Sequence, residues 1–117
     1  MTISKASRLA LPLLSLCLLA ACAQPPKTLY QWEGYQAQVY EHFKGQSPQQ
    51  QITELEKGLE RIAAKGNLPP PGYRAQLGML YAETGRDDLA LQQLQAEKAA
   101  FPESAAYIDF LLKKYQK

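Results

Sequence analysis

The chain has 117 residues and a formal net charge of +2, with 46% hydrophobic and 21% charged residues. Lys5 and Arg8, which lie among the first 21 residues, account for the whole positive excess, so the remaining chain is balanced in side-chain charge. This length allows one small domain, and the balanced charge argues against a nucleic-acid binder, which normally carries a basic stripe.

The first 21 residues have the pattern of an export signal. Lys5 and Arg8 precede the apolar run of residues 9–19, and small residues then lead to Cys22. The apolar run is shorter than the ~20 residues of a membrane-spanning helix. A positive start followed by a short apolar run and a small-residue exit is typical of a cleaved signal peptide. We therefore expect residues 1–21 to be removed.

Leu19-Ala20-Ala21-Cys22 resembles the lipobox of bacterial lipoproteins. The resemblance implies that the Cys22 thiol carries a diacylglyceryl group, that the signal is cut before Cys22 and that the new amine is acylated. Ala23 stands where an aspartate favours inner-membrane retention in enterobacteria, which implies an outer-membrane lipoprotein facing the periplasm. The alternative is an ordinary signal with an incidental cysteine. Cys17 leaves with the signal, so the domain is expected to be stabilised by packing without a disulfide.

Residues 22–28 are predicted to form the lipidated cysteine and a short linker, and residues 29–117 a single helical domain. The linker contains Pro25-Pro26. Six fully extended residues reach at most ~20 Å. We therefore expect the domain to lie close to the membrane.

Apolar spacing predicts five helices and no sheet, because no long segment alternates with a period of two. The first predicted helix starts near Leu29 and carries one apolar stripe of Trp32, Tyr35, Val39 and Phe43. The second predicted helix follows Ser47-Pro48, the third covers residues 73–84, and the fourth runs from Asp87, as N-cap, to about residue 101. The fifth covers residues 103–115, and its apolar face consists of Tyr107, Ile108, Leu111, Leu112 and Tyr115. The expected fold class is all-α, an antiparallel array of about five helices.

Residues 71–104 resemble a tetratricopeptide repeat. They contain Leu77-Gly78-x-x-Tyr81, followed by Gly85, Ala90, Leu94 and Pro102. Gly78 and Ala90 are small, so the two helices of this hairpin are expected to approach closely. The pattern departs from the repeat in two places: Tyr73 is the nearest aromatic residue to the expected start, and Glu97 replaces a small residue. The alternative is a generic helical bundle.

The whole mature chain resembles a family of short proteobacterial lipoproteins of unknown function. The resemblance rests on Leu29-Tyr30-x-Trp32-x-x-Tyr35, Pro71-Gly72, Leu77-Gly78-x-x-Tyr81, Glu97-Lys98 and Phe101-Pro102-Glu103-Ser104. Members are typically encoded beside a lipoprotein that resembles the curli secretion channel and beside another small lipoprotein. The resemblance implies membership of an envelope lipoprotein complex, and it supplies no catalytic residue.

Residues suited to catalysis are sparse in the expected domain. His42 is its one histidine, and no nucleophile elbow, metal-ligand spacing or phosphate-binding loop is present in the sequence. We therefore predict no enzymatic activity, no cofactor, no metal and no small-molecule substrate.

The domain is rich in aromatic residues, which either fill its core or present a surface to a partner. We predict a non-enzymatic, lipid-anchored adaptor or accessory subunit, possessing no nucleic-acid site, that binds other envelope lipoproteins at the outer membrane. The residues expected to bind the partner are Trp32, Tyr35, Tyr73, Arg74, Leu77 and Tyr81. The alternatives are a regulator of a peptidoglycan synthase or hydrolase, and an enzyme acting on envelope glycan.

Overall fold

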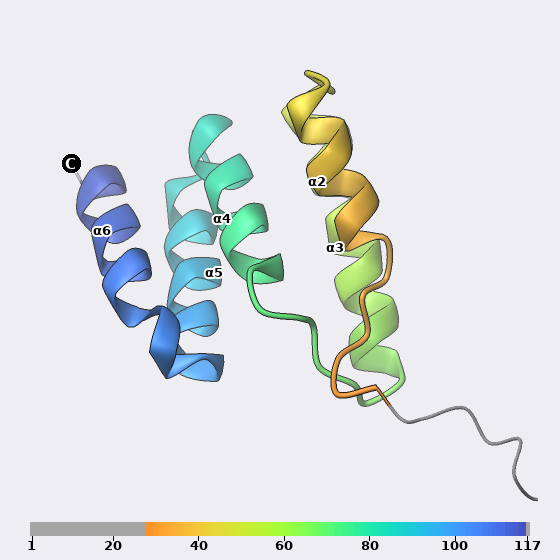
Figure 1. Cartoon of the computed structure of the whole chain (residues 1–117). Helices are drawn as coiled ribbons and strands as arrows, with labels where there is room; N and C mark the ends of the chain where they lie inside the picture. Colours follow the sequence, from red (N-terminus) through yellow and green to blue (C-terminus); the bar gives the residue numbers. More distant parts are fainter. Residues whose placement is uncertain (1–27, 117) are drawn as a thin grey trace, which may run out of the picture.

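The computed structural model describes residues 28–116, which form five α-helices, one short 3-10 helix and no strand (Figure 1). The elements are α2 (Tyr35–Phe43), α3 (Pro48–Ala64), α4 (Tyr73–Glu83), α5 (Asp87–Ala100), the 3-10 helix η1 (Pro102–Ser104) and α6 (Ala105–Tyr115). The predicted all-α array is confirmed. The predicted signal peptide, Cys22 and linker residues 23–27 lie outside the described residues.

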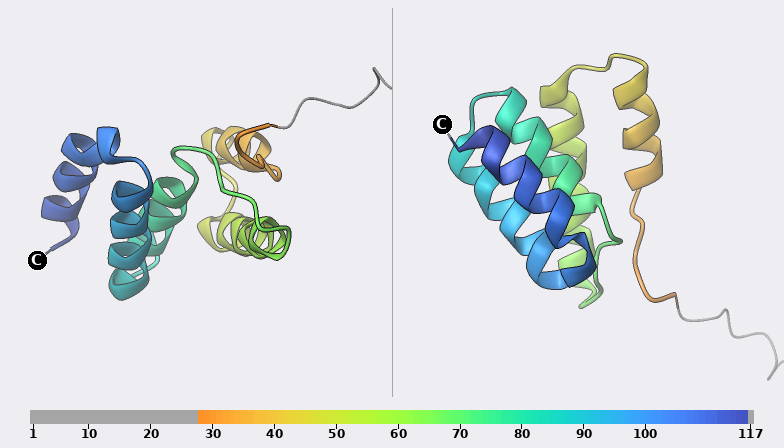
Figure 2. Two further views of the ribbon diagram at one scale, coloured as in Figure 1. Left: turned by 90° about the horizontal axis from the view of Figure 1, so that it is seen from below. Right: turned by 60° about the vertical axis from the view of Figure 1, so that its left-hand side comes forward.

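The helices lie side by side in chain order, and each runs antiparallel to the one before it (Figures 1 and 2). Helix α4 packs most extensively on α5, whereas the α2–α3 hairpin and α6 lie at the two sides of the array. One end of the array, which we call the entry end, is formed by residues 28–32, 65–72 and 99–104. Over residues 28–116, no helix has the length and apolar character needed to cross a bilayer.

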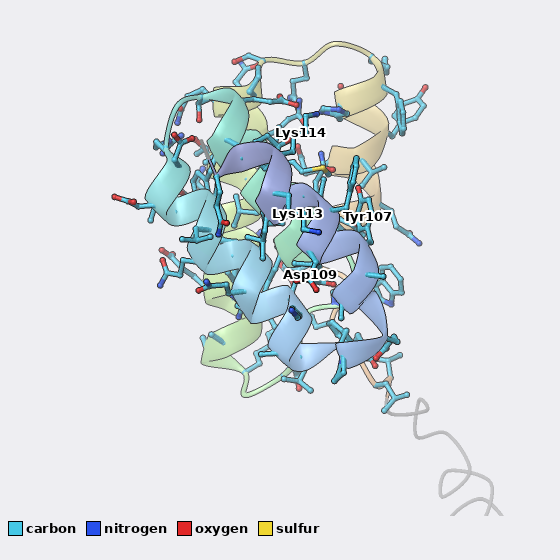
Figure 3. All side chains as sticks on the ribbon, turned by 90° about the vertical axis from the view of Figure 1, so that its left-hand side faces the viewer. Tyr107, Asp109, Lys113 and Lys114 are labelled. Atoms are coloured by element: carbon cyan, nitrogen blue, oxygen red, sulfur yellow. The ribbon has the colours of Figure 1, made fainter. Side chains whose placement is uncertain are left out.

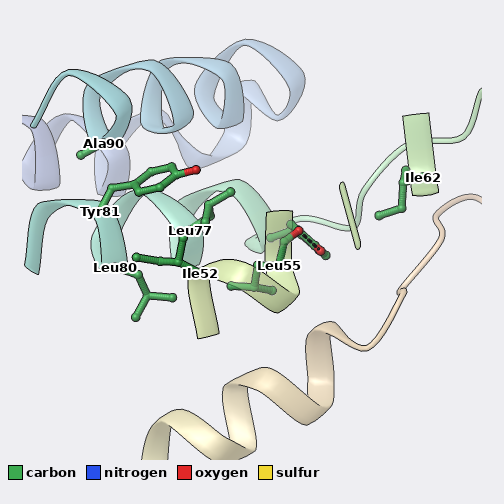
Figure 4. Packing of buried hydrophobic residues seen from close by; sticks show 8 residues of the cluster. Ile52, Leu55, Ile62, Leu77, Leu80, Tyr81 and Ala90 are labelled. Carbon is green, nitrogen blue, oxygen red and sulfur yellow. Dashed lines mark hydrogen bonds between the residues drawn. The ribbon is translucent and has the colours of Figure 1, made fainter. Parts of the chain in front are cut away.

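Helix α4 lies at the centre of the core. Seven of its eleven residues are buried, as expected for a helix that has neighbours all round. One buried cluster joins α3 and α4 and reaches Ala90 of α5; its members are Ile52, Leu55, Ile62, Tyr73, Leu77, Leu80, Tyr81 and Ala90 (Figure 4). A second cluster joins α4 to α5 and α6 through Ala75, Leu94, Ile108 and Leu111.

Gly78 allows α4 and α5 to touch. A Cβ atom at this position would lie 3.0 Å from Cγ of Leu94 and 3.2 Å from the carbonyl oxygen of Ala90. Ala90 and Leu94 are themselves 1% and 0% exposed. The close approach predicted from the small residues Gly78 and Ala90 is therefore confirmed.

We predict that Gly78→Val destabilises the domain by about 1–3 kcal/mol, because added methyl groups overpack a closed contact. Ala63→Val is the matched control, since Ala63 is an exposed residue of α3 and its change should stay within about 0.5 kcal/mol. Urea unfolding followed by circular dichroism measures both variants. Equal stabilities of the two would contradict the close contact.

The first helix starts later than the sequence indicated. Glu33 and Gly34 have φ angles of +33° and +74°, and α2 begins after them at Tyr35. The preceding segment instead pairs with the α3–α4 loop, where the Gln31 amide donates to the carbonyl oxygen of Leu68 at 2.9 Å. Trp32 therefore precedes the helix, and the predicted stripe from Trp32 to Phe43 does not form.

Other predicted boundaries agree closely with the structure. Ser47 is the N-cap residue of α3 and Pro48 its first residue, as predicted. Asp87 is the first residue of α5 and Arg86 the N-cap, so the predicted capping role of Asp87 is wrong by one position. The last predicted helix is divided, because Pro102–Ser104 forms η1 before α6 begins at Ala105.

Tyr73 is a core residue with a satisfied hydroxyl group. Its side chain is 0% exposed, and its Oη donates to the carbonyl oxygen of Leu55 at 2.7 Å. Burial raises the pKa of Tyr73 to about 12 from its ordinary value of 10.0. Burial, together with the hydrogen bond that Tyr81 donates to Glu56, also raises the pKa of Tyr81.

The raised pKa of Tyr73 predicts a loss of stability in alkali. The unfolded chain releases this proton from about pH 10, whereas folded Tyr73 keeps it until pH rises to about 12. The free energy of unfolding should therefore fall across this window, and the fall should be smaller in Tyr73→Phe. Urea titrations at successive pH values measure it. Tyr40→Phe, at an exposed ring, is the control, and an equal slope in all three proteins would contradict the prediction.

Candidate interaction surface

The structure divides the six residues predicted to bind a partner into buried residues and residues that reach the surface. Tyr73, Leu77 and Tyr81 are only 0%, 1% and 5% exposed. They lie in the core between α3, α4 and α5, because α4 has neighbours on all sides. A partner on the surface of the folded domain cannot contact them extensively, so we remove these three residues from the predicted surface.

Trp32, Tyr35 and Tyr73 form a continuous aromatic seam from the surface into the core. The Trp32 and Tyr35 rings are stacked with centroids 6.3 Å apart, and the Tyr35 and Tyr73 rings are 5.3 Å apart. Trp32 is 45% exposed, Tyr35 is half-buried and Tyr73 is buried. Trp32 and Tyr35 therefore remain available to a partner, and their orientation is set by the core.

Glu97 lies at the inner side of this seam. Its side chain is 2% exposed, and its Oε1 accepts a hydrogen bond from the Gly72 amide at 2.6 Å. Gly72 is the N-cap residue of α4, where a helix favours a negative charge. Burial, and secondly the charge of Glu97, raises the pKa of Tyr35. In the sequence, Glu97 is a departure from the repeat pattern. In the structure, its hydrogen bond to Gly72 connects α5 to the start of α4.

Removing this carboxylate should loosen the start of α4. We predict that Glu97→Ala lowers the free energy of unfolding by about 2 kcal/mol, because the Gly72 amide loses a charge-assisted acceptor. Glu97→Gln keeps an acceptor oxygen and should cost about half as much. Gln95→Ala, on the exposed face of α5, is the control. Denaturant unfolding and exchange of the Gly72 amide measure these effects, and a neutral Glu97→Ala would contradict the assignment.

Arg74 lines two open hollows. It donates a hydrogen bond from Nη1 to Oε1 of Gln93 at 3.0 Å. The larger hollow, of about 680 Å³, is at the entry end and is lined by Tyr30, Leu68, Pro69, Arg74, Ala96, Ala99, Ala100, Phe101 and Glu103. The smaller, of about 400 Å³, includes the exposed edges of Leu77 and Tyr81. Alanine and aromatic side chains dominate the larger hollow, so it suits apolar contacts rather than acid–base chemistry.

Four aromatic side chains that are exposed in the structure were either predicted to lie on an apolar helix face or given no role in the sequence analysis. Tyr40 and Phe43 of α2 are 62% and 83% exposed, and Tyr107 and Phe110 of α6 are 54% and 64% exposed. Helix α2 has no buried residue at all. The prediction that Phe43 and Tyr107 belong to buried apolar faces was wrong, since both rings are mostly exposed and each belongs to a helix at one side of the array (Figure 1).

Tyr107 lies on the side of α6 that faces α4 and α2 (Figure 3). Its hydroxyl group contacts Sδ of Met79 at 3.8 Å. Tyr107 also contributes, after burial and Glu97, to the raised pKa of Tyr35. Of the four exposed rings, Tyr107 therefore lies near Tyr35 in the aromatic seam.

Charged groups in the described part of the chain form surface ion pairs. Arg61 pairs with Glu33, and Lys98 pairs with Asp109 at 2.6 Å. A hydrogen bond from Gln31, and secondly the contact with Arg61, lowers the pKa of Glu33. Within residues 28–116, no three histidine, cysteine or acidic side chains gather as metal ligands would. The ion pair between Arg61 and Glu33 connects α3 to the segment before α2.

Comparison with known proteins identifies a family. A family model described as a domain of unknown function (DUF4810) matches residues 29–111. Neither a curated protein nor a solved structure matches the chain. The tetratricopeptide likeness and the lipoprotein pattern therefore remain predictions. Because the match covers most of the sequence and all of α2 to α5, the chain belongs to the DUF4810 family.

Proposed function

We propose that this protein is a lipid-anchored accessory subunit that acts as an adaptor in an envelope lipoprotein complex, on the periplasmic face of the outer membrane. The anchor is the Cys22 thiol, at the end of a lipobox-like sequence. The partner is another envelope lipoprotein, and the complex is related to secretion. This proposal draws its location from the sequence pattern and its mode of action from the exposed surface.

The observation that carries the adaptor role is the exposure of aromatic side chains on both outer helices. Tyr40, Phe43, Tyr107 and Phe110 are each more than half exposed. The outer helices of a helical array have a face without a neighbour, which is normally polar when it meets only water. Large exposed rings are typical anchors of protein interfaces. A partner packed on α2 or α6 would cover them.

The proposed surface keeps three residues predicted from the sequence and adds the four exposed rings. Trp32 and Tyr35 contribute the outer part of the aromatic seam, and Arg74 contributes a charged group at the rim of the larger hollow. Their side chains come from the segment before α2, from α2 and from α4. An interface across these elements would recognise the folded array rather than one helix.

We propose no enzymatic activity for this surface. Its larger hollow is lined by alanine, aromatic and proline side chains around Arg74 and Glu103. Those two charged side chains provide neither a nucleophile nor a pair of carboxylates of the kind that glycoside hydrolysis requires. Binding through apolar area is the activity that this composition supports.

The proposal predicts that partner capture depends on the anchor and on the outer helices. We expect crosslinked pull-down of the full-length protein from its own membranes to recover one or two lipoproteins. Cys22→Ala should lose them. Tyr40→Ser with Phe43→Ser, or Tyr107→Ser with Phe110→Ser, should reduce recovery at least about tenfold, since interface anchors contribute roughly 2 kcal/mol each.

Leu89→Ser is the matched control, because Leu89 is an exposed apolar residue of α5 outside the proposed surface. It should leave recovery unchanged. Undiminished capture by both paired variants would refute the aromatic surface. Recovery of a peptidoglycan synthase or hydrolase in place of a lipoprotein would favour the regulatory alternative.

A further inference from the structure

The entry end of the array carries few charged side chains, and we propose that it docks onto the phospholipid bilayer, with Leu29 and Leu68 entering the boundary between headgroups and acyl chains. The docking holds the helix axes upright on the membrane. This inference rests on the lipid anchor at Cys22 proposed above, and it adds a second membrane contact made by the folded domain itself.

Leu29 and Leu68 are exposed on neighbouring segments although they are far apart in the sequence. Their side chains are 83% and 62% exposed. The Gln31 amide donates to the Leu68 carbonyl oxygen at 2.9 Å, and Asn67 Nδ2 donates to Gln31 Oε1 at 2.7 Å. These bonds join the segment that carries Leu29 to the loop that carries Leu68, so the two leucines belong to one connected part of the entry end.

The larger hollow continues this apolar edge. Leu68 lines it together with Tyr30 and Phe101, whose rings meet edge to face at 5.7 Å. Its alanine-rich wall comes from the last turns of α5. Arg74 and Glu103 are the charged members of its lining, and an acyl-chain segment of a bilayer lipid matches the apolar remainder and the open shape of about 680 Å³.

Charge is distributed unequally between the two ends of the array. At the entry end the exposed charged side chains are Lys65 and Glu103, at the margins of two uncharged stretches, residues 66–72 and 99–102. Pro71, Ala99, Ala100 and Pro102 are exposed there. The opposite end carries Lys44, Arg86, Asp87, Asp88 and Lys114; Lys114 is labelled in Figure 3. Charged groups favour water and apolar groups favour the bilayer boundary, so the two ends suit opposite environments.

The position of the proposed anchor selects the same end. Cys22 precedes Thr28 by six residues, which reach at most ~20 Å. The described chain begins at the entry end (Figure 2). A tether of this length holds the apolar end near the bilayer at high effective concentration, so even a weak insertion of two leucines becomes persistent. The exposed rings of α2 and α6 then face sideways, toward neighbouring membrane lipoproteins.

Fluorescence quenching by brominated lipid tests the orientation. Trp32 is the one tryptophan of the chain, so Trp32→Phe provides a background without one. In this background we compare Leu68→Trp with Phe43→Trp, which places the reporter at an exposed site at the opposite end; Phe43 is 83% exposed and Leu68 62%. The full-length lipidated variants are reconstituted in liposomes of phosphatidylethanolamine and phosphatidylglycerol with or without brominated acyl chains.

We expect brominated lipid to lower the fluorescence of Leu68→Trp at least about twofold and that of Phe43→Trp by less than about a tenth, because only the first reporter reaches the acyl region. Leu29→Trp provides a second reporter at the entry end and should behave as Leu68→Trp does. Circular dichroism confirms that each variant retains its helices.

Flotation with the liposomes separates the two proposals. Protein that floats but shows equal quenching at the two ends, or none, keeps the anchor and overturns the docking. Protein that does not float overturns the anchor at Cys22, and the docking with it. Flotation together with quenching confined to Leu29→Trp and Leu68→Trp supports both.

Discussion

The close contact between α4 and α5 is the constraint on which the rest of the structure depends. Gly78 brings the α4 backbone against Ala90 and Leu94, and seven of the eleven residues of α4 are buried. One side of α4 then closes the core with α3, and the other closes it with α5 and α6. A small domain held by packing alone is sensitive to any atom added at such a contact.

The segment before α2 is held by several weak connections to this core rather than by helical packing. Gln31 bonds to Leu68 and Glu33 pairs with Arg61, and the ring of Tyr35, the first residue of α2, lies against Tyr73. Together these contacts place α2 beside α3 without burying any residue of α2. The same arrangement that positions Trp32 and Tyr35 therefore leaves the rings of Tyr40 and Phe43 exposed to solvent.

The two proposed surfaces adjoin at the larger hollow, which Arg74 lines, and elsewhere they lie on different parts of the array. The apolar entry end would contact lipid, whereas the exposed rings on α2 and α6 would contact a protein beside it on the membrane. Anchoring and docking would restrict the domain to one orientation, which reduces the rotational freedom lost when a partner binds. The adaptor would then bind its partner more tightly without a larger interface.

The sequence by itself determined the fold class, the positions of most helix ends and the contact between Gly78 and Ala90. Helix type and helix ends are local, because periodicity, glycine and proline act on a few consecutive residues. The Gly78–Ala90 contact followed from the repeat-like pattern that spans both helices. The anchor at Cys22 is likewise a sequence pattern, and it remains a prediction. Only the tertiary structure decided that Tyr73, Leu77 and Tyr81 are core residues, that Phe43 and Tyr107 are exposed, and that Glu97 meets Gly72. Burial depends on how many neighbours a helix has in space, and the apolar period of one helix does not show how many other helices pack against it.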